Sequence, residues 1–161
     1  MNTLDILRYG HQTVVKSLDA VPQGEWQHPG VTGIWSVKDI VAHLASFEHT
    51  LLEVLVGLLG EDKPTPYLKR MATLGPQGFN DYEVEQRQTM TPGEVLAEYT
   101  TTHEEVMAFA ARIPADTYRQ TGILPWYGAE YDLDDFLVYS FYGHKREHMA
   151  QVDRFRDTLA D

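Results

Sequence analysis

Two histidines near the C-terminal end of the sequence have the spacing of a metal-binding pair. His144 and His148 are four residues apart, so on a helix both rings project from one face and can ligate a single ion. A third ligand must then come from another segment of the chain. His43 is the natural supplier, because it lies between Ile40 and Phe47 on an apolar helical stripe of its own. Together the three residues predict a metal site built from two distant segments.

A site of three neutral imidazoles favours chemistry or ligand capture over a purely structural role. Structural zinc sites use four protein ligands, whereas catalytic sites keep one position open for water or substrate. Three histidines leave a divalent ion its full charge, and such an ion lowers the pKa of bound water toward about 7. Because protons compete for the imidazoles, we expect metal affinity to fall as the pH drops below about 6.

Other histidines also fall on apolar helical stripes. Five of the seven do so, namely His11, His43, His103, His144 and His148. A buried ring needs a hydrogen-bond or metal partner, so we expect these stripes to converge on a shared polar pocket. His11 and His103 are candidates for lining that pocket or for acid–base chemistry, and core histidines with ordinary partners fit the sequence equally well. The catalytic residues are therefore left open.

The segment that ends in His148 also matches the H-x-x-E-H signature of inverted zinc proteases, in which Glu147 would be the general base. Only thirteen residues follow His148, whereas that class takes its third ligand well downstream. Glu147 lies about 100° around the helix from His148, so a solvated surface position is favoured, with a supporting role beside the metal as the alternative. Glu48 is likewise expected to face solvent.

Helices must bring the three histidines together, because the sequence has no convincing alternation of apolar and polar residues that would predict β-strands. Apolar residues at steps of three and four predict four helices, over residues 4–21, 36–60, 91–113 and 131–159. Two of the helices begin with capping boxes, in which Ser36 pairs with Asp39 and Thr91 pairs with Glu94. The sequence therefore predicts an all-α four-helix bundle, with residues 1–161 as a single domain.

The connection between the second and third predicted helices is long enough to cross over the bundle. It spans about thirty residues, a length that suits a crossover better than a tight turn. Pro64 and Pro66 mark a break, and the segment 80–83 carries a capping signal for a short extra helix. The aromatic-rich linkers 26–35 and 123–131 are expected to be ordered loops packed over one end of the bundle.

Composition narrows the classes of partner. The 161 residues carry a formal net charge of −11, which argues against binding to nucleic acid or to an anionic membrane surface. The N-terminus does not resemble a signal peptide, and the longest weakly charged stretch, 51–60, is too short to span a bilayer. The absence of cysteine excludes a thiolate nucleophile in the protein. We expect a cytoplasmic protein that acts on a small molecule.

Two motifs in combination resemble those of the DinB/YfiT-like superfamily of metal-binding four-helix bundles. The first runs from Trp35 to Leu44 as W-S-x-x-D-x-x-x-H-L, and the second is the H-x-x-x-H of His144 and His148 about a hundred residues later. The resemblance covers the whole chain and implies an up-down-down-up bundle with a long crossover between helices two and three. It also implies that His43, His144 and His148 hold zinc, nickel or a related divalent ion with water, and that the protein can form a homodimer.

The activities known in this superfamily set the functional expectation. They include thiol S-transferases that use bacillithiol or mycothiol, a mycothiol-dependent isomerase and proposed metal-dependent hydrolases. By this resemblance we expect the ion to activate a low-molecular-weight thiol, taken from solution, for transfer to a small electrophile held beneath the loops of Trp35 and Trp126. The alternatives are a hydrolase in which the ion activates water and a non-catalytic protein that binds or sequesters a small ligand.

Overall fold

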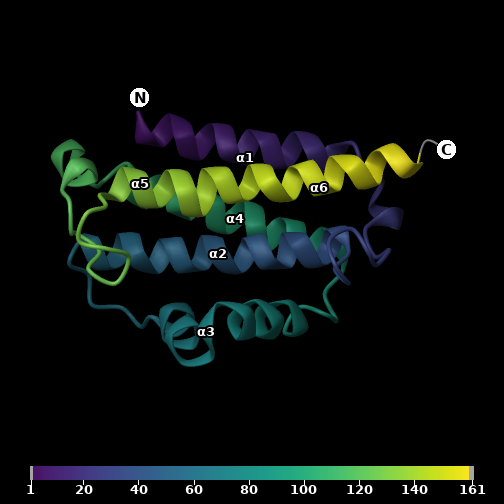
Figure 1. Cartoon of the computed structure of the whole chain (residues 1–161), viewed down its shortest axis with the longest axis horizontal. Coiled ribbons are helices and arrows are strands. Elements are labelled where there is room, and N and C mark those ends of the chain that lie inside the picture. The colour runs from purple at the N-terminus through teal and green to yellow at the C-terminus, as the bar shows by residue number, and fades with distance from the viewer. Residues whose placement is uncertain (1, 160–161) are drawn as a thin grey trace.

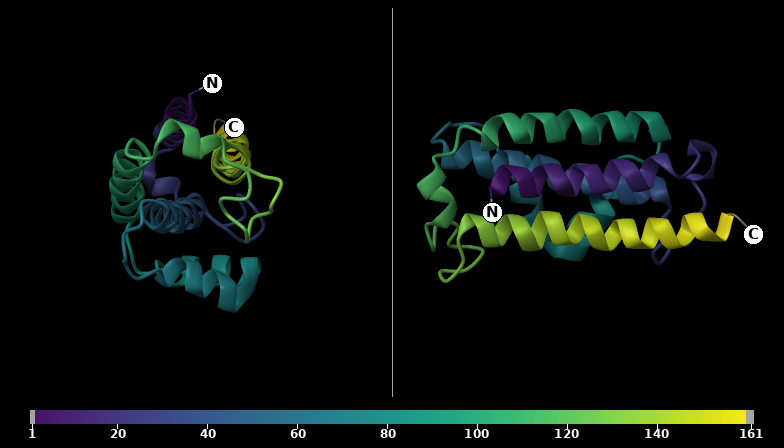
Figure 2. Two further views of the ribbon diagram at one scale, coloured as in Figure 1. Left: turned by 90° about the vertical axis from the view of Figure 1, so that its left-hand side faces the viewer. Right: turned by 90° about the horizontal axis from the view of Figure 1, so that it is seen from above.

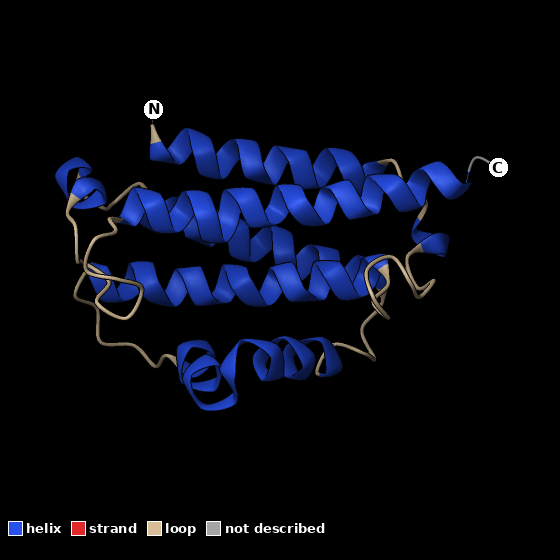
Figure 3. Ribbon diagram, viewed as in Figure 1, coloured by secondary structure: helices blue, strands red, loops and turns tan. Residues whose placement is uncertain are grey.

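Five helical rods make up most of residues 2–159, the part of the chain that the computed structural model describes. No β-strand occurs within that range (Figure 3). The principal helices are α1 (Thr3–Asp19), α2 (Val37–Leu58), α3 (Pro66–Glu85), α4 (Pro92–Ala110), α5 (Leu133–Leu137) and α6 (His144–Leu159). A π-helical segment, η3 (Val138–Gly143), joins α5 to α6 in one continuous rod (Figure 1). Short 3₁₀ turns, η1 (Gln23–Glu25) and η2 (Ala115–Arg119), follow α1 and α4.

The helix directions give an up-down-down-up bundle. In Figure 1, α1 and the α5–α6 rod run from left to right, whereas α2 and α4 run in the opposite direction. The view along the bundle in Figure 2 places these four rods around a common core, with α3 outside them against α2. The all-α fold predicted from the sequence is confirmed, and α3 occupies the predicted crossover.

The capping boxes read from the sequence form as expected. The Ser36 hydroxyl accepts from the Asp39 amide at 3.1 Å while the Asp39 carboxylate accepts from the Ser36 amide at 3.0 Å. Thr91 and Glu94 make the equivalent pair at 3.2 and 2.9 Å. These reciprocal bonds satisfy backbone N–H groups that a helix start leaves without partners, and they fix where α2 and α4 begin.

The crossover is more helical than the sequence suggests. We expected a short helix from residue 80, but α3 begins at Pro66 and contains Asn80 in its interior. The break predicted after the second helix is present, since α2 ends at Leu58, but Pro66 also occupies the first turn of the next helix, where its missing N–H is harmless. The helix bends at Gly75, whose φ of 72° and ψ of 173° are not helical. Glycine tolerates this positive φ without steric cost.

The core surrounds α2, which is buried on most of its surface. By length and composition α2 is the one described helix that could cross a membrane, but 72% of its most apolar stretch is buried in the bundle, as is typical of a core helix. The two aromatic-rich linkers cover opposite ends of the bundle instead of one end. Residues 26–35 join α1 to α2, whereas residues 123–131 lie at the other end, before α5 (Figure 1).

Candidate metal centre

Three histidine side chains from two helices meet inside the bundle. The Nε2 atom of His144 lies 2.9 Å from Nε2 of His43 and 2.9 Å from Nε2 of His148. One nitrogen from each of the three rings lies within 4.8 Å of the others. His43 comes from the second turn of α2, and the other two histidines come from the first two turns of α6. This cluster could hold a metal ion.

The contacts of His144 and His148 indicate which ring nitrogens carry their protons. His148 Nδ1 lies 2.9 Å from the Gln151 Oε1 oxygen, which can only accept, so the ring proton is on Nδ1. A backbone hydrogen bond with Ser140 contributes to the pKa of His144, and Nδ1 is the ring nitrogen placed to make it, because Nε2 faces the other histidines. We infer that neither Nε2 atom carries a proton, although the two atoms lie only 2.9 Å apart. Two facing lone pairs repel unless a cation lies between them, so the donor set fits a metal ion.

Burial keeps the three rings neutral. It lowers the pKa of His43 to about 2, helped by the neighbouring His144 and His148. Burial also lowers the pKa of His144 to about 4, with a further contribution from His148, and it lowers the pKa of His148. Imidazoles must be neutral to bind a metal. From the sequence we expected protons to compete with a metal for these rings below about pH 6. With the lowered pKa values, this competition in the folded protein begins at a lower pH.

Aromatic side chains enclose the cluster on two sides. The Trp35 ring lies 5.0 Å from the ring of His43 and 6.5 Å from that of His148. The Phe47 ring lies 4.8 Å from His43 and 4.7 Å from His144. An apolar shell of this kind restricts water and strengthens the electrostatic interactions inside it.

His11 and His103 belong to a different group of contacts. Their rings stack with centroids 3.9 Å apart, His11 Nδ1 lies 3.2 Å from the Tyr99 hydroxyl, and His103 Nδ1 lies 3.3 Å from a Glu48 oxygen. No hydrogen bond or ring contact among the described residues joins them to the three-histidine cluster. The expectation of one shared histidine pocket is therefore wrong, and a role for either ring in acid–base chemistry stays a prediction.

Glu48 is fully buried, contrary to the expectation that it faces solvent. Its carboxylate forms an ion pair with Lys145, which is also buried. Burial alone would raise the pKa of Glu48, but Lys145 and His103 outweigh it and lower the pKa to about 2. A signal for this burial was present in the sequence. Glu48 lies at helical spacing between Leu44 and Leu51, both of which are buried.

Lys145 was missed because the buried stripe is displaced by one position from the predicted one between Phe141 and Val152. The prediction placed His144 and His148 on the stripe, but the buried side chains of α6 are Lys145, Met149 and Val152, of which only Val152 was predicted. The two histidines therefore lie beside the stripe and are only partly buried. A π-helical segment such as η3 adds an extra residue to a helical turn, and periodicity alone does not reveal it.

The remaining predicted positions lie outside the cluster. Glu147 is exposed, as the surface interpretation expected. His28 is exposed and pairs with Glu25 at 3.0 Å. His49 lies 3.1 Å from Glu98 and takes no part in the cluster.

A small aromatic pocket adjoins the cluster. It has a volume of about 210 Å³ and is lined by residues of α2, α3, the 123–131 loop, α5 and η3. Phe47 lines this pocket and also contacts His43 and His144, so one side chain separates the pocket from the cluster. Trp126 and Tyr127, which the sequence placed in an ordered loop, are part of its wall.

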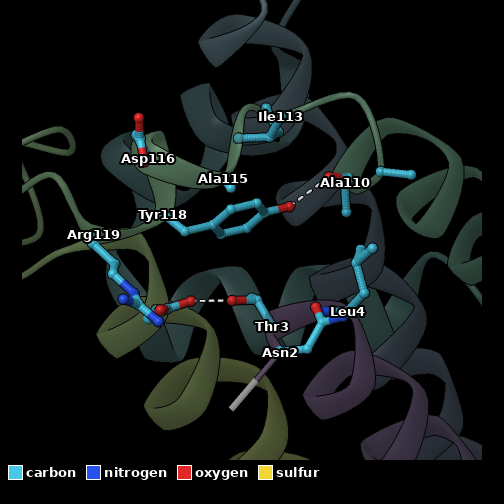
Figure 4. Close-up of a pocket in the computed structure, with 11 residues that line it drawn as sticks. Asn2, Thr3, Leu4, Ala110, Ile113, Ala115, Asp116, Tyr118 and Arg119 are labelled. Carbon is cyan, nitrogen blue, oxygen red and sulfur yellow. Dashed lines mark hydrogen bonds between the residues drawn. The ribbon is translucent and has the colours of Figure 1, made fainter.

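A larger cavity of about 430 Å³ lies elsewhere, between the start of α1, the end of α4 and the 3₁₀ turn η2 (Figure 4). There the Tyr118 hydroxyl donates to the Ala110 carbonyl oxygen at 2.5 Å, and the Thr3 hydroxyl donates to the Asp134 carboxylate. None of the predicted site residues lines this cavity. We therefore place the candidate site at the histidine cluster and its aromatic pocket.

Comparison with known protein families identifies the family of this chain. The family model of the DinB superfamily matches residues 6–152, and the chain belongs to that superfamily. A search of curated proteins gives no match, and a search of solved structures gives none either.

Proposed function

We propose that this protein is a metal-dependent enzyme that transfers a low-molecular-weight thiol to a small electrophile. His43, His144 and His148 would hold a divalent ion, zinc or nickel, through their Nε2 atoms. The observation that carries the proposal is the facing pair of Nε2 atoms, 2.9 Å apart, within a cluster that could bind a metal. When bound, the ion supplies a positive charge that stabilises a thiolate at neutral pH.

The surrounding side chains support this chemistry by fixing protons and restricting water. Gln151 and the Ser140 backbone accept the Nδ1 protons of His148 and His144, so both rings keep the tautomer that a metal requires. Trp35 and Phe47 cover the cluster with apolar surface. The protein has no cysteine, so the thiol would enter from solution.

The pocket beside the cluster favours thiol transfer over hydrolysis. Hydrolysis of an amide or ester benefits from an acid or base that protonates the leaving group. No carboxylate or histidine is among the described residues that line the aromatic pocket. A thiolate that attacks an electrophilic carbon needs no such group when the leaving group departs as an anion.

A direct test uses zinc- or nickel-loaded protein with 1-chloro-2,4-dinitrobenzene as the electrophile. In this reaction the thiolate sulfur bonds to the ring carbon and chloride leaves. Cysteine, glutathione, bacillithiol and mycothiol are tried in turn, and the coloured thioether is followed by absorbance. We expect multiple turnovers with at least one thiol, lost in His144→Ala and kept in the exposed control His28→Ala. Uncatalysed rates with all four thiols on fully loaded protein would contradict the proposal. Stoichiometric capture without turnover would instead indicate a sequestration protein.

We further propose that the protein acts in the cytoplasm on small molecules, without nucleic acid or membrane partners, which is consistent with its net charge of −11. A homodimer is a further expectation from the family. Size-exclusion chromatography with light scattering tests it directly. A mass near 18.4 kDa at all accessible concentrations would contradict the dimer.

A further inference from the structure

We propose that the aromatic pocket binds an uncharged planar molecule, an aromatic or conjugated ring compound with one polar group that the Asn80 amide recognises. This inference deepens the proposed function, because the bound molecule would be the electrophile. The argument depends on the walls of the pocket, its lack of charge, one unsatisfied amide and its volume.

The walls are built from aromatic rings packed edge to face. Phe136 is central among them, with its ring centroid 5.5 Å from Trp126 at 88° and 5.0 Å from Tyr127 at 71°. Phe141 lies 5.3 Å from Phe136 at 76°, and Phe47 closes the side next to the histidines. Aromatic walls favour a flat ring, because ring faces and edges attract through their quadrupoles as well as through burial.

The pocket excludes charged ligands. Its lining contains no Asp, Glu, Lys, Arg or His side chain among the described residues. A carboxylate or an ammonium that entered would lose its hydration without gaining an ionic partner, which is costly. A neutral molecule loses much less hydration free energy when it enters the pocket.

Asn80 is the polar group best suited to orient such a ligand. Its Oδ1 atom is buried and has no hydrogen-bond partner, although native proteins satisfy most buried polar groups. Thr50, a polar side chain of α2 that also lines the pocket, already donates its hydroxyl to the Ser46 carbonyl oxygen at 2.9 Å. The Oδ1 atom has almost no accessible surface as placed, so we infer that the Asn80 amide turns toward the pocket to meet a ligand, a rotation that breaks no hydrogen bond to Oδ1.

The volume sets the size of the ligand. An apolar protein cavity of about 150 Å³ accepts benzene, and this pocket measures about 210 Å³. It therefore suits one ring with a small substituent. Such a ring would lie against Phe47, whose other neighbours are His43 and His144, and so beside the place where the nucleophile would be activated.

The test compares three probes of similar size: benzamide, benzoate and cyclohexanecarboxamide. Benzamide is planar and neutral, benzoate is planar but charged, and cyclohexanecarboxamide is neutral but not planar. Each is titrated by calorimetry, with the fluorescence of the half-exposed Trp126 as a second signal. We expect benzamide to bind at least tenfold more tightly than either of the others. Equal binding of benzoate, or no binding of benzamide, would overturn the inference.

Variants assign the contacts. Asn80→Ala should weaken the binding of benzamide by about two- to tenfold, the contribution of one neutral hydrogen bond. It should leave the binding of toluene unchanged. Gln86→Ala, an exposed change at the C-cap of the same helix, is the matched control and should alter neither. Should Asn80→Ala fail to fold, the ¹H–¹⁵N signals of the Asn80 side chain in the wild-type protein give the same answer. These signals should shift when benzamide binds. Signals that do not move at a saturating concentration of benzamide would contradict the contact between Asn80 and the ligand.

The binding titrations are made on both chelator-stripped and zinc-loaded protein, so that the two proposals can fail separately. Benzamide binding to both forms without any thiol transfer would retain the pocket and remove the proposed enzyme activity. Thiol transfer without benzamide binding to either form would retain the metal chemistry and remove this pocket as the substrate site.

Discussion

His144 and His148 face each other with their Nε2 atoms 2.9 Å apart, while the Nδ1 side of each ring bonds an oxygen acceptor supplied by Ser140 or Gln151. With the ring protons on the Nδ1 atoms, as these acceptors favour, the two Nε2 lone pairs repel each other unless a cation lies between them. A cation turns the same geometry into an attraction. This relationship links the local hydrogen bonds of α6 to the metal-binding role that we propose.

Zinc should therefore stabilise the folded protein. A ligand that binds only the folded state adds about 2.7 kcal/mol at a free concentration one hundred times its Kd. We expect zinc to raise the melting temperature of the wild-type protein and to leave that of His148→Ala unchanged. Calorimetry with and without a chelator measures the difference. Equal zinc-induced shifts in both proteins would show that zinc binds elsewhere.

Gln151 should tune metal affinity without touching the ion. Its side-chain oxygen lies 2.9 Å from His148 Nδ1, and loss of such a partner costs roughly 10–100-fold in metal affinity. Gln151→Leu should weaken zinc binding by about that factor in competition with a chromophoric chelator. Gln86→Leu, at an exposed position, is the control. Unchanged affinity in Gln151→Leu would remove the tautomer argument.

The stability of the metal-free protein should fall as the pH is lowered from about 6.5 to about 4. The pKa values of His43 and His144 are about 2 and about 4 in the folded protein, below the ordinary value of 6.5. In this interval the unfolded chain binds protons that the folded chain does not, so the stabilisation is complete above pH 6.5 and is lost below it.

Each such histidine contributes a slope of up to about 1.4 kcal/mol per pH unit. Urea unfolding at pH 7, 6 and 5 measures this slope. His43→Leu should have a smaller slope than the wild-type protein, because one of the titrating groups has been removed. Parallel pH profiles of the two proteins would contradict the lowered pKa of His43.

The buried Glu48–Lys145 ion pair predicts strong coupling in a double-mutant cycle. Removal of one partner leaves a buried charge without a counterion, which costs about 3–5 kcal/mol, whereas replacement of both by apolar residues can be close to neutral. We expect Glu48→Leu and Lys145→Met to destabilise the protein separately, and the double variant to recover much of the loss. Urea unfolding of the metal-free proteins gives the free energies.

The exposed pair Arg8–Asp5, at 2.6 Å, is the matched control for this cycle. Solvent screens such pairs, and their contribution is typically below about 1 kcal/mol. Arg8→Met should therefore change stability little. Additive effects of Glu48→Leu and Lys145→Met would mean that the two side chains are not coupled.

The helices that carry strong local signals could be predicted from the sequence. Ser36 with Asp39, and Thr91 with Glu94, fix the starts of α2 and α4 through bonds within four residues, so no tertiary information is needed. The start of α3 could not be predicted from such local bonds. Pro66 is compatible with both a break and a first helical turn, and packing of α3 against α2 decides between them.

The three-histidine cluster was predictable because His144 and His148 have i,i+4 spacing and His43 lies on an apolar stripe of α2. The contacts of Glu48 with His103 and Lys145 could not be predicted, because Glu48 looks like a surface residue until its partner is known. Lys145 supplies that partner from a position nearly one hundred residues away, and the π-helical segment before α6 decides which side chains of this helix are buried. Asn80 became visible as a candidate only when α3, α2 and the 123–131 loop were seen to enclose one pocket.

The most direct test of the central claim is the metal content of protein purified without an affinity tag, measured by elemental analysis. We predict close to one zinc or nickel ion per chain in the wild-type protein and in the exposed-histidine control His28→Ala. His43→Ala and His148→Ala should each lose it. Wild-type protein that takes up no divalent metal under any loading condition, or a His43→Ala variant that retains a full complement, would contradict the account.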